Sequence, residues 1–127
     1  MASTMEIGKQ LVELCRQGKE REAMERFYSP EIVSIEAMGA PTMPARMEGI
    51  GAVRGKAEWW EKNNEVHSRQ AEGPWPHGDR FIVRFVYDVT AKAGPMAGKR
   101  MRIDEAALYT VNDGKIVQEE FFYHMGG

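Results

Sequence analysis

Several acidic side chains stand where the pattern of the chain predicts strands, and carboxyl groups can move protons without a cofactor. Glu36 follows Val33-Ser34-Ile35, and strand alternation places it on the side of Ser34, opposite Ile35. A carboxyl group in an apolar cavity has a raised pKa, which suits it to exchange protons near neutral pH. We therefore predict a general base at Glu36. The alternative is a glutamate at the end of a strand that reaches solvent.

Two acidic pairs, Asp104-Glu105 and Glu119-Glu120, lie within the strands predicted for residues 101–111 and 115–123. Adjacent residues of a strand point to opposite faces of its sheet. One acid of each pair is therefore expected to enter a cavity, while its neighbour enters an interface or an ion pair. Structural ion pairs alone would produce the same pattern, and this alternative stays open.

The turn between these two strands indicates which acids share a face. With Asp113-Gly114 as the central pair of a hairpin turn, Ala107 is expected to face Glu120. Glu105 and Glu120 then lie on one face, together with Tyr109, and we predict that both acids are catalytic. A shift of one residue in the register would instead favour the other member of each pair.

Histidine and aspartate add two further candidates. His67 follows the third predicted helix, where a strand could direct it into a cavity, and its ordinary pKa suits acid–base work. Asp88 shares a strand face with Arg84, and a cross-strand salt bridge to Arg100 or Arg102 is the ordinary explanation for such a charge. Ligand binding by Asp88 is the alternative. The histidine spacing matches no metal motif, so we predict neither a metal site nor a cofactor.

Large apolar side chains supply candidate ligand contacts. Trp59 is rotated by about 100° from Trp60 on the predicted third helix, so it could line a pocket or its rim. Met38 belongs to a loop rich in methionine, a flexible residue that adapts to apolar partners. This loop is expected either to cover the cavity or to pack nowhere in particular. Tyr109 joins these candidates because it shares the face of Glu105.

The spacing of apolar residues predicts the elements that position these side chains. Helices are expected over residues 5–28, interrupted at Gly18, and over residues 50–63. Strands are expected over 31–37, 66–71, 81–88, 101–111 and 115–123, with a loop over 38–47 and a break at 73–76. Helices grouped early and hairpin strands grouped late indicate an α+β fold.

Composition limits the class of protein. The chain has 127 residues, 43% of them hydrophobic, which suits one domain over residues 1–127. Its net charge of −2 gives no electrostatic footprint for nucleic acid. No apolar run approaches the roughly 20 residues of a membrane helix, and the first residues do not resemble a secretory signal. The single cysteine suits a reducing compartment, so we expect a cytoplasmic protein without nucleic-acid or membrane partners.

Three segments resemble the SnoaL-like branch of the nuclear-transport-factor-2-like superfamily, and the resemblance spans nearly the whole chain. They are Arg26-Phe27-Tyr28-Ser29-Pro30-Glu31, Gly49-Ile50-Gly51-Ala52-Val53 and Leu108-Tyr109-Thr110-Val111-Asn112-Asp113-Gly114-Lys115-Ile116-Val117. The resemblance implies a cystatin-like cone in which three helices of the amino-terminal half pack on a curved, mixed and mostly antiparallel sheet and enclose a pocket. It also implies a homodimer formed through the other sheet face.

The resemblance bears on the candidate residues one by one. Glu36 stands where ketosteroid isomerases have their carboxylate base, but Leu11 occupies the position of their oxyanion-stabilising tyrosine. Glu120 matches a carboxylate of the limonene epoxide hydrolases, and Asp88 aligns with another. Val86 takes the place of the arginine of those hydrolases. Neither of these two family activities is therefore expected in its complete form.

From these observations we expect a pocket protein that carries out cofactor-free cyclisation, isomerisation, dehydration or epoxide opening on a small hydrophobic molecule. The predicted catalytic residues are Glu36, Glu120, Glu105 and His67, and the predicted ligand contacts are Trp59, Tyr109, Asp88 and Met38. The alternative is a non-catalytic domain for small-molecule binding or dimerisation. A transport adaptor is a third class, supported by superfamily membership alone.

Overall fold

The structure, a computed structural model, describes residues 2–39 and 43–124. Its elements are, in order, α1 (Thr4–Arg16), α2 (Glu20–Phe27), β1 (Tyr28–Ile35), β2 (Arg46–Glu48), α3 (Ile50–Asn63), β3 (Asn64–His77), β4 (Arg80–Ala91), β5 (Arg100–Asn112) and β6 (Lys115–Phe122). Apart from the short β2, this is the order of elements predicted from the sequence.

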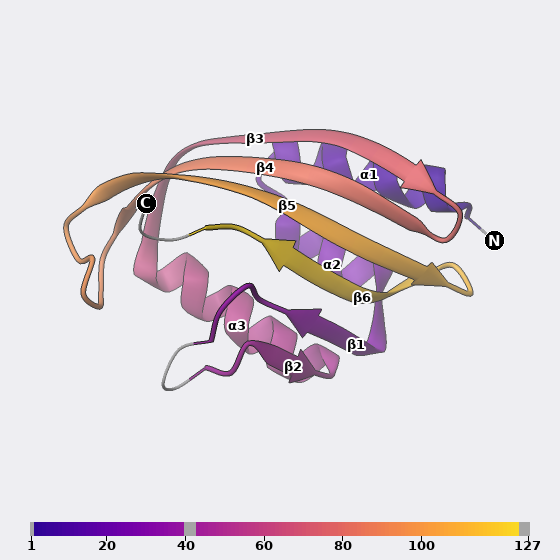
Figure 1. Cartoon of the computed structure of the whole chain (residues 1–127), viewed down its shortest axis with the longest axis horizontal. Helices are drawn as coiled ribbons and strands as arrows, with labels where there is room; N and C mark the ends of the chain where they lie inside the picture. Colours follow the sequence, from indigo (N-terminus) through magenta and orange to yellow (C-terminus); the bar gives the residue numbers. More distant parts are fainter. Residues whose placement is uncertain (1, 40–42, 125–127) are drawn as a thin grey trace.

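The strands form one mixed sheet with the order β2-β1-β6-β5-β4-β3. Strand β1 runs parallel to β6, and every other neighbouring pair is antiparallel. Figure 1 shows β3, β4 and β5 as long curved strands with α1 and α2 behind them, and α3 beside β1 and β2. The predicted α+β class, with three helices on a curved and mostly antiparallel sheet, is therefore confirmed.

The two amino-terminal helices follow the apolar periodicity of the sequence. Ile7, Leu11 and Cys15 recur on one face of α1 and are buried in the core. Ser3 caps this helix by accepting a hydrogen bond of 3.2 Å from the backbone N–H of Glu6. Gly18 follows the helix with a φ of +74°, a conformation that glycine adopts without steric cost. The predicted interruption at Gly18 is thus confirmed.

The sequence prediction placed a break and a loop in two segments where the structure has strands. Strand β3 continues through the prolines at 73–76, because a shift in register between Glu72 and Trp75 accommodates them, and pairing resumes with Trp75 opposite Ile82. Since β3 is an edge strand, a proline there can leave the paired side of the ladder intact. The loop predicted for residues 38–47 runs partly into β2, in which Met47 pairs with Ser34. Residues 40–42 of that loop lie outside the described part.

The hairpin between β5 and β6 corrects the predicted register. Asp113 and Gly114 form its turn as predicted, with φ values of +51° and +74°. The register then shifts, because Val117 is an extra residue on β6 between the paired positions on either side of it. Ala107 consequently pairs with Phe121 and not with Glu120. The face assignment along β6 is therefore displaced by one residue from the prediction.

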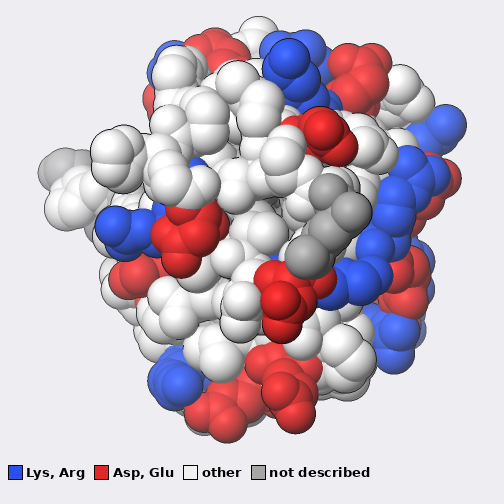
Figure 2. Space-filling model, turned by 90° about the vertical axis from the view of Figure 1, so that its right-hand side faces the viewer, with Lys and Arg blue, Asp and Glu red and all other residues white. Residues whose placement is uncertain are grey.

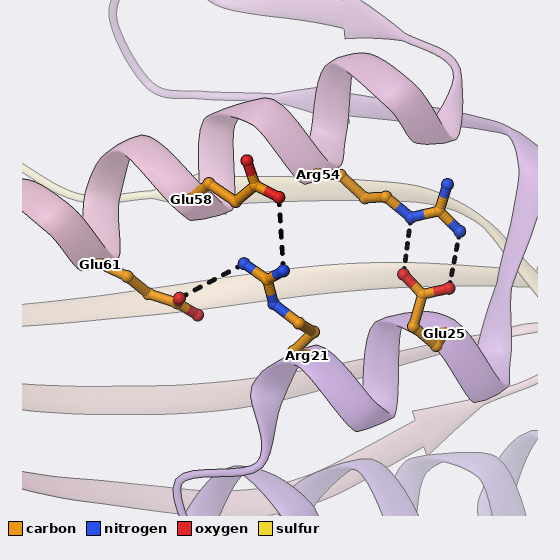
Figure 3. A network of polar contacts seen from close by, with 5 residues as sticks. All are labelled: Arg21, Glu25, Arg54, Glu58 and Glu61. Atoms are coloured by element: carbon orange, nitrogen blue, oxygen red, sulfur yellow. Dashed lines mark hydrogen bonds and ion pairs between the residues drawn. The ribbon is translucent and has the colours of Figure 1, made fainter.

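Helix α3 is joined to α2 by exposed ion pairs (Figure 3). Arg21 of α2 lies 3.3 Å from the carboxylate of Glu58, and Arg54 of α3 donates two hydrogen bonds of 2.6 Å to Glu25 of α2. All residues of α3 are described, and among them only Val53 is buried. Exposed ion pairs contribute about 0–1 kcal/mol each, so the packing that holds α3 is concentrated around Val53.

Charged residues of both signs are intermixed on the face that Figure 2 shows, around an area without charges. Lys and Arg gather along the right-hand side of this view, with Asp and Glu beside them. Within the described residues, no helix has the length and apolar character that crossing a bilayer requires.

Gly8 of α1 lies so close to β3 that a side chain would collide there. A Cβ atom on Gly8 would lie 2.8 Å from Cβ and 2.9 Å from Cγ of Pro74, whose ring cannot rotate away. An alanine normally favours a helix over glycine by about 0.5–1 kcal/mol, whereas overpacking costs about 1–3 kcal/mol. We therefore expect Gly8→Ala to lower the free energy of unfolding by about 1 kcal/mol.

The matched control is Gly55→Ala on α3, where an added Cβ atom would meet open space. This change is expected to raise the free energy of unfolding by about 0.5 kcal/mol. Urea denaturation followed by circular dichroism measures both variants. An equal gain in stability at both positions would contradict the close packing of α1 on β3.

Candidate functional site

A cavity of about 790 Å³ lies between the helices and the sheet face that they cover, here called the inner face. Its lining comes from all three helices and from β1, β3, β4, β5 and β6. Three aromatic rings form a continuous wall of this cavity: the ring centroids of Trp60 and Tyr87 lie 5.5 Å apart, and those of Tyr87 and Phe85 lie 6.0 Å apart. The cavity therefore offers a large apolar surface to a small molecule.

Glu105 directs an unpartnered carboxyl group into this aromatic cavity. It lies on β5 directly opposite Phe85 of β4. Within the part of the chain that the structure describes, it makes no hydrogen bond or ion pair. Burial, together with the charges of Glu36 and Glu119, raises the pKa of Glu105 to about 8 against the opposing charge of Lys56. Glu105 is therefore largely protonated at pH 7 and can donate a proton or a hydrogen bond.

Glu119 is the most deeply buried acid of the cavity, with 3% of its surface exposed. Its Oε2 accepts a hydrogen bond of 2.7 Å from the hydroxyl group of Ser34, and its Oε1 accepts one from the hydroxyl group of Tyr28. Burial raises the pKa of Glu119, while Lys56 and the two hydroxyl groups oppose this shift. Burial and the Glu119 charge also raise the pKa of Tyr28, so its hydroxyl group keeps its proton and acts as a donor.

Lys56 of α3 connects the buried acid to the wall of the cavity. Its ammonium group lies 3.1 Å from Oε1 of Glu36 and donates a hydrogen bond to the hydroxyl group of Ser34. It also lies 5.3 Å from the centroid of the Phe121 ring. The side chains of Lys56 and Glu36 are 13% and 26% exposed, so this ion pair is largely shielded from water. The cavity thus combines a hydrogen-bonded polar network with one carboxyl group outside it.

Comparison with known proteins identifies the family. The family model of the SnoaL-like domain matches residues 2–123. This chain belongs to the SnoaL-like family. A candidate SnoaL-like polyketide cyclase from Mesorhizobium loti, also called a carbohydrate phosphatase, is 43% identical, with a TM-score of 0.89, and the match covers 96% of this chain and 100% of that one. Among curated proteins the search finds no match.

More distant solved structures share the fold. A protein of unknown function with a cystatin-like fold from Xanthomonas campestris is 16% identical, with a TM-score of 0.76 and coverage of 96% of this chain and 91% of that one. A protein with a ketosteroid isomerase-like fold from Catenulispora acidiphila, solved with trimethylamine, is 17% identical, with a TM-score of 0.71 and coverage of 94% and 86%. The cystatin-like architecture implied by the sequence resemblance is confirmed.

Five residues predicted for the site line the cavity of this SnoaL-like domain. They are Glu36, Glu105, Trp59, Tyr109 and Met38. Trp59 lies at the rim, since half of its surface is exposed, whereas Tyr109 is buried. Their roles in catalysis or ligand binding remain predictions, but their positions permit contact with a bound molecule.

Three other predicted residues lie away from the cavity. Glu120 is displaced to the outer face of the sheet, because the extra residue in β6 turns Glu119 inward. His67 sits where the register between β3 and β4 shifts, and its exposed ring lies 2.7 Å from the hydroxyl oxygen of Thr90. Asp88 lies on the outer face and pairs with Arg100 at 2.8 Å, the salt bridge named as its ordinary explanation.

Sequence reasoning missed the polar network around Glu119. It named Glu119 only as the result of a shifted register and assigned no role to Tyr28, Ser34 or Lys56. Two weak signals were present: Ser34 and Glu36 are polar residues on one strand face, and Lys56 follows the buried Val53 at helical spacing. Within the described residues no group of three or more histidine, cysteine or acidic side chains could hold a metal ion.

Proposed function

We propose that this SnoaL-like domain transfers protons, without a cofactor, on a small and largely apolar molecule bound in the cavity. The observation that carries this proposal is the carboxyl group of Glu105, which is buried against aromatic rings, has no partner among the described residues and has a pKa raised to about 8. A group with such a pKa can be protonated at neutral pH and can still release its proton.

The roles follow from the states of the carboxyl groups. Protonated Glu105 donates a hydrogen bond or a proton to a carbonyl, hydroxyl or epoxide oxygen of the substrate. The carboxylate of Glu36, beside Lys56, accepts a proton from carbon or from water. Isomerisation, cyclisation, dehydration and the opening of an epoxide by water are all reactions that a positioned acid and base can catalyse. The relative from Mesorhizobium loti, a candidate polyketide cyclase, supports this class of chemistry.

The test is hydrogen exchange on a simple ketone, 2-tetralone, whose acidic C–H bond lies next to its carbonyl group. In D₂O at pH 7 we expect the protein to accelerate the replacement of these hydrogens by deuterium, measured by proton NMR. Loss of one positioned acid or base costs about 10²–10⁴-fold in rate, so Glu36→Gln and Glu105→Gln are each expected to slow the exchange by at least about 100-fold.

The control is Glu120→Gln on the outer face, which is expected to leave the exchange rate unchanged. Exchange no faster than in buffer, or exchange retained in the Glu36→Gln variant, would contradict the proposed chemistry. Binding of 2-tetralone without exchange would favour a non-catalytic binding domain.

A second candidate function is the binding of an organic cation without catalysis. The aromatic wall beside the unpartnered Glu105 favours it, since aromatic rings and a carboxylate together attract ammonium groups. The related structure from Catenulispora acidiphila was solved with trimethylamine. Under this alternative, affinity for tetramethylammonium would rise as the pH passes about 8 and Glu105 ionises.

The homodimer implied by the family resemblance also remains a proposal. The outer face of the sheet offers exposed apolar side chains to a second copy, notably Trp75, Ile82 and Phe122, which are 53%, 42% and 51% exposed. The cytoplasmic location likewise remains a prediction.

A further inference from the structure

Lys56 is placed at the junction of two carboxylates. It contacts Glu36 directly at 3.1 Å and reaches Glu119 through the hydroxyl group of Ser34. Its Nζ also lies 5.3 Å from the centroid of the Phe121 ring, within the range of a cation–π contact. The sequence had not predicted a cation between these two carboxyl groups.

The chemistry of the ammonium group fixes the direction of the hydrogen bonds. An ammonium group can only donate, so the oxygen of Ser34 accepts from Lys56. The hydrogen of the Ser34 hydroxyl group is then directed to Oε2 of Glu119, at 2.7 Å. Tyr28 donates to the other oxygen, Oε1. Glu119 therefore receives a hydrogen bond at each oxygen, an arrangement that stabilises its ionised form.

Glu105 receives no such support. It makes no hydrogen bond or ion pair with the described residues, and Lys56 is the weakest of the influences on its pKa. One cation thus acts unequally on three neighbouring carboxyl groups.

We propose that Lys56 is the positioning residue of this site: it fixes Glu36 by an ion pair and, through Ser34, supports the charged form of Glu119, whereas Glu105 receives no such contact. The catalytic part of this inference rests on the proposed function. In that reaction, the contacts of Lys56 would explain why Glu36 serves as the base and Glu105 as the acid.

Among the titratable groups that interact with Glu119, Lys56 differs from the others in the sign of its charge. The titratable side chains that act on Glu119, or that it acts on, are Cys15 of α1, Tyr28 and Glu36 beside β1, Lys56 of α3, and Glu105 and Tyr109 of β5. Of these six groups, Lys56 is the one that carries a positive charge. Its removal leaves the remaining five either neutral or negative.

The experiment is an NMR titration of the glutamate side chains, labelled with carbon-13 at Cδ and assigned with glutamine variants, in the protein without ligand. In the Lys56→Met variant we expect the titration midpoint of Glu119 to rise by at least about one unit, because one opposite charge shifts a pKa by about 1–3 units. Lys56→Arg is expected to restore the midpoint, and the exposed Lys62→Met on the same helix is expected to leave it unchanged.

Ser34→Ala provides a second variant, which removes the bridge but keeps the lysine. It is expected to raise the midpoint of Glu119. If Lys56→Met does not fold, the combined results for Ser34→Ala and Lys56→Arg decide the question. An unchanged midpoint of Glu119 in Ser34→Ala, and in Lys56→Met where that variant folds, would overturn the proposal.

This titration is independent of the ketone assay. A shift of Glu119 in the absence of any catalysed exchange would uphold the role of Lys56 in supporting the charged form of Glu119 and refute the proposed proton transfer. Catalysed exchange together with an unchanged midpoint of Glu119 would support the proposed proton transfer and refute the role of Lys56.

Discussion

Glutamine in place of Glu105 is expected to raise the free energy of unfolding by about 4 kcal/mol at pH 8.5 and by less than about 0.5 kcal/mol at pH 4.5. The pKa of Glu105 is about 8 in the folded protein and 4.5 as the ordinary reference value. Glutamine has the shape of the protonated carboxyl group but cannot ionise. The substitution therefore removes the cost of placing a carboxylate against the aromatic wall.

The sign of this pH dependence follows from the proton count. Between pH 4.5 and about pH 8 the unfolded chain has released a proton that folded Glu105 retains, so stability falls as pH rises, by up to about 1.4 kcal/mol per unit. Below this window both states are protonated and the cost is absent. Above it both states are ionised and the cost stays constant.

Urea denaturation at pH 4.5, 6.5 and 8.5 measures the effect. Glu120→Gln serves as the control, because Glu120 lies outside the cavity, and its stability is expected to follow the pH dependence of the unmodified protein. If the curve of Glu105→Gln runs parallel to that of the unmodified protein, Glu105 does not carry a raised pKa.

Truncation of Glu119 to alanine is expected to lower the free energy of unfolding by about 3 kcal/mol. The change leaves the hydroxyl groups of Tyr28 and Ser34 without their acceptor and removes the carboxylate that Lys56 reaches through Ser34. Removal of one member of a buried charged network costs about 3–5 kcal/mol, and each unsatisfied buried donor about 1–3 kcal/mol.

The neighbouring Glu120→Ala is the matched control, and it is expected to change the free energy of unfolding by less than about 0.5 kcal/mol. The loss of stability for Glu119→Gln is expected to fall between these two values. The amide oxygen can accept a hydrogen bond from Ser34, and the hydroxyl group of Tyr28 can turn so that its oxygen accepts one from the amide NH₂ group. Urea denaturation at pH 7 compares the three variants. An equal loss of unfolding free energy for Glu119→Ala and Glu120→Ala would contradict the burial of Glu119 in the polar network.

Glu36, Glu105 and Glu120 show which positions in the site could be predicted from patterns within single strands. Strand alternation placed Glu36 on the side of Ser34, the predicted hairpin register favoured Glu105 over Asp104, and Glu36 and Glu105 both line the cavity. The same alternation failed for Glu120, although the turn residues Asp113 and Gly114 were identified correctly. One extra residue, Val117, reverses the face of every later residue in β6, and nothing in its type distinguishes it from its neighbours.

The partners of charged residues depend on contacts between distant segments. Asp88 pairs with Arg100 across a single hairpin, and the sequence named this partner as one of two. Glu119 and Ser34 lie 85 positions apart, and they meet only because β1 runs parallel to β6. Parallel pairing of distant strands leaves no local signal, so the network around Lys56 could not be predicted.

The sequence by itself determined the α+β class, the order of the main helices and strands, and the presence of acids on the inner sheet face, because these depend on periodicities within single elements. Tertiary structure decided which acid of β6 enters the cavity, that Lys56 contacts Glu36 directly and Glu119 through Ser34, and that Glu105 has no partner among the described residues. The physical reason is that the pKa of a carboxyl group depends on burial and on neighbouring charges, and both are set by the register and packing of segments far apart in the chain.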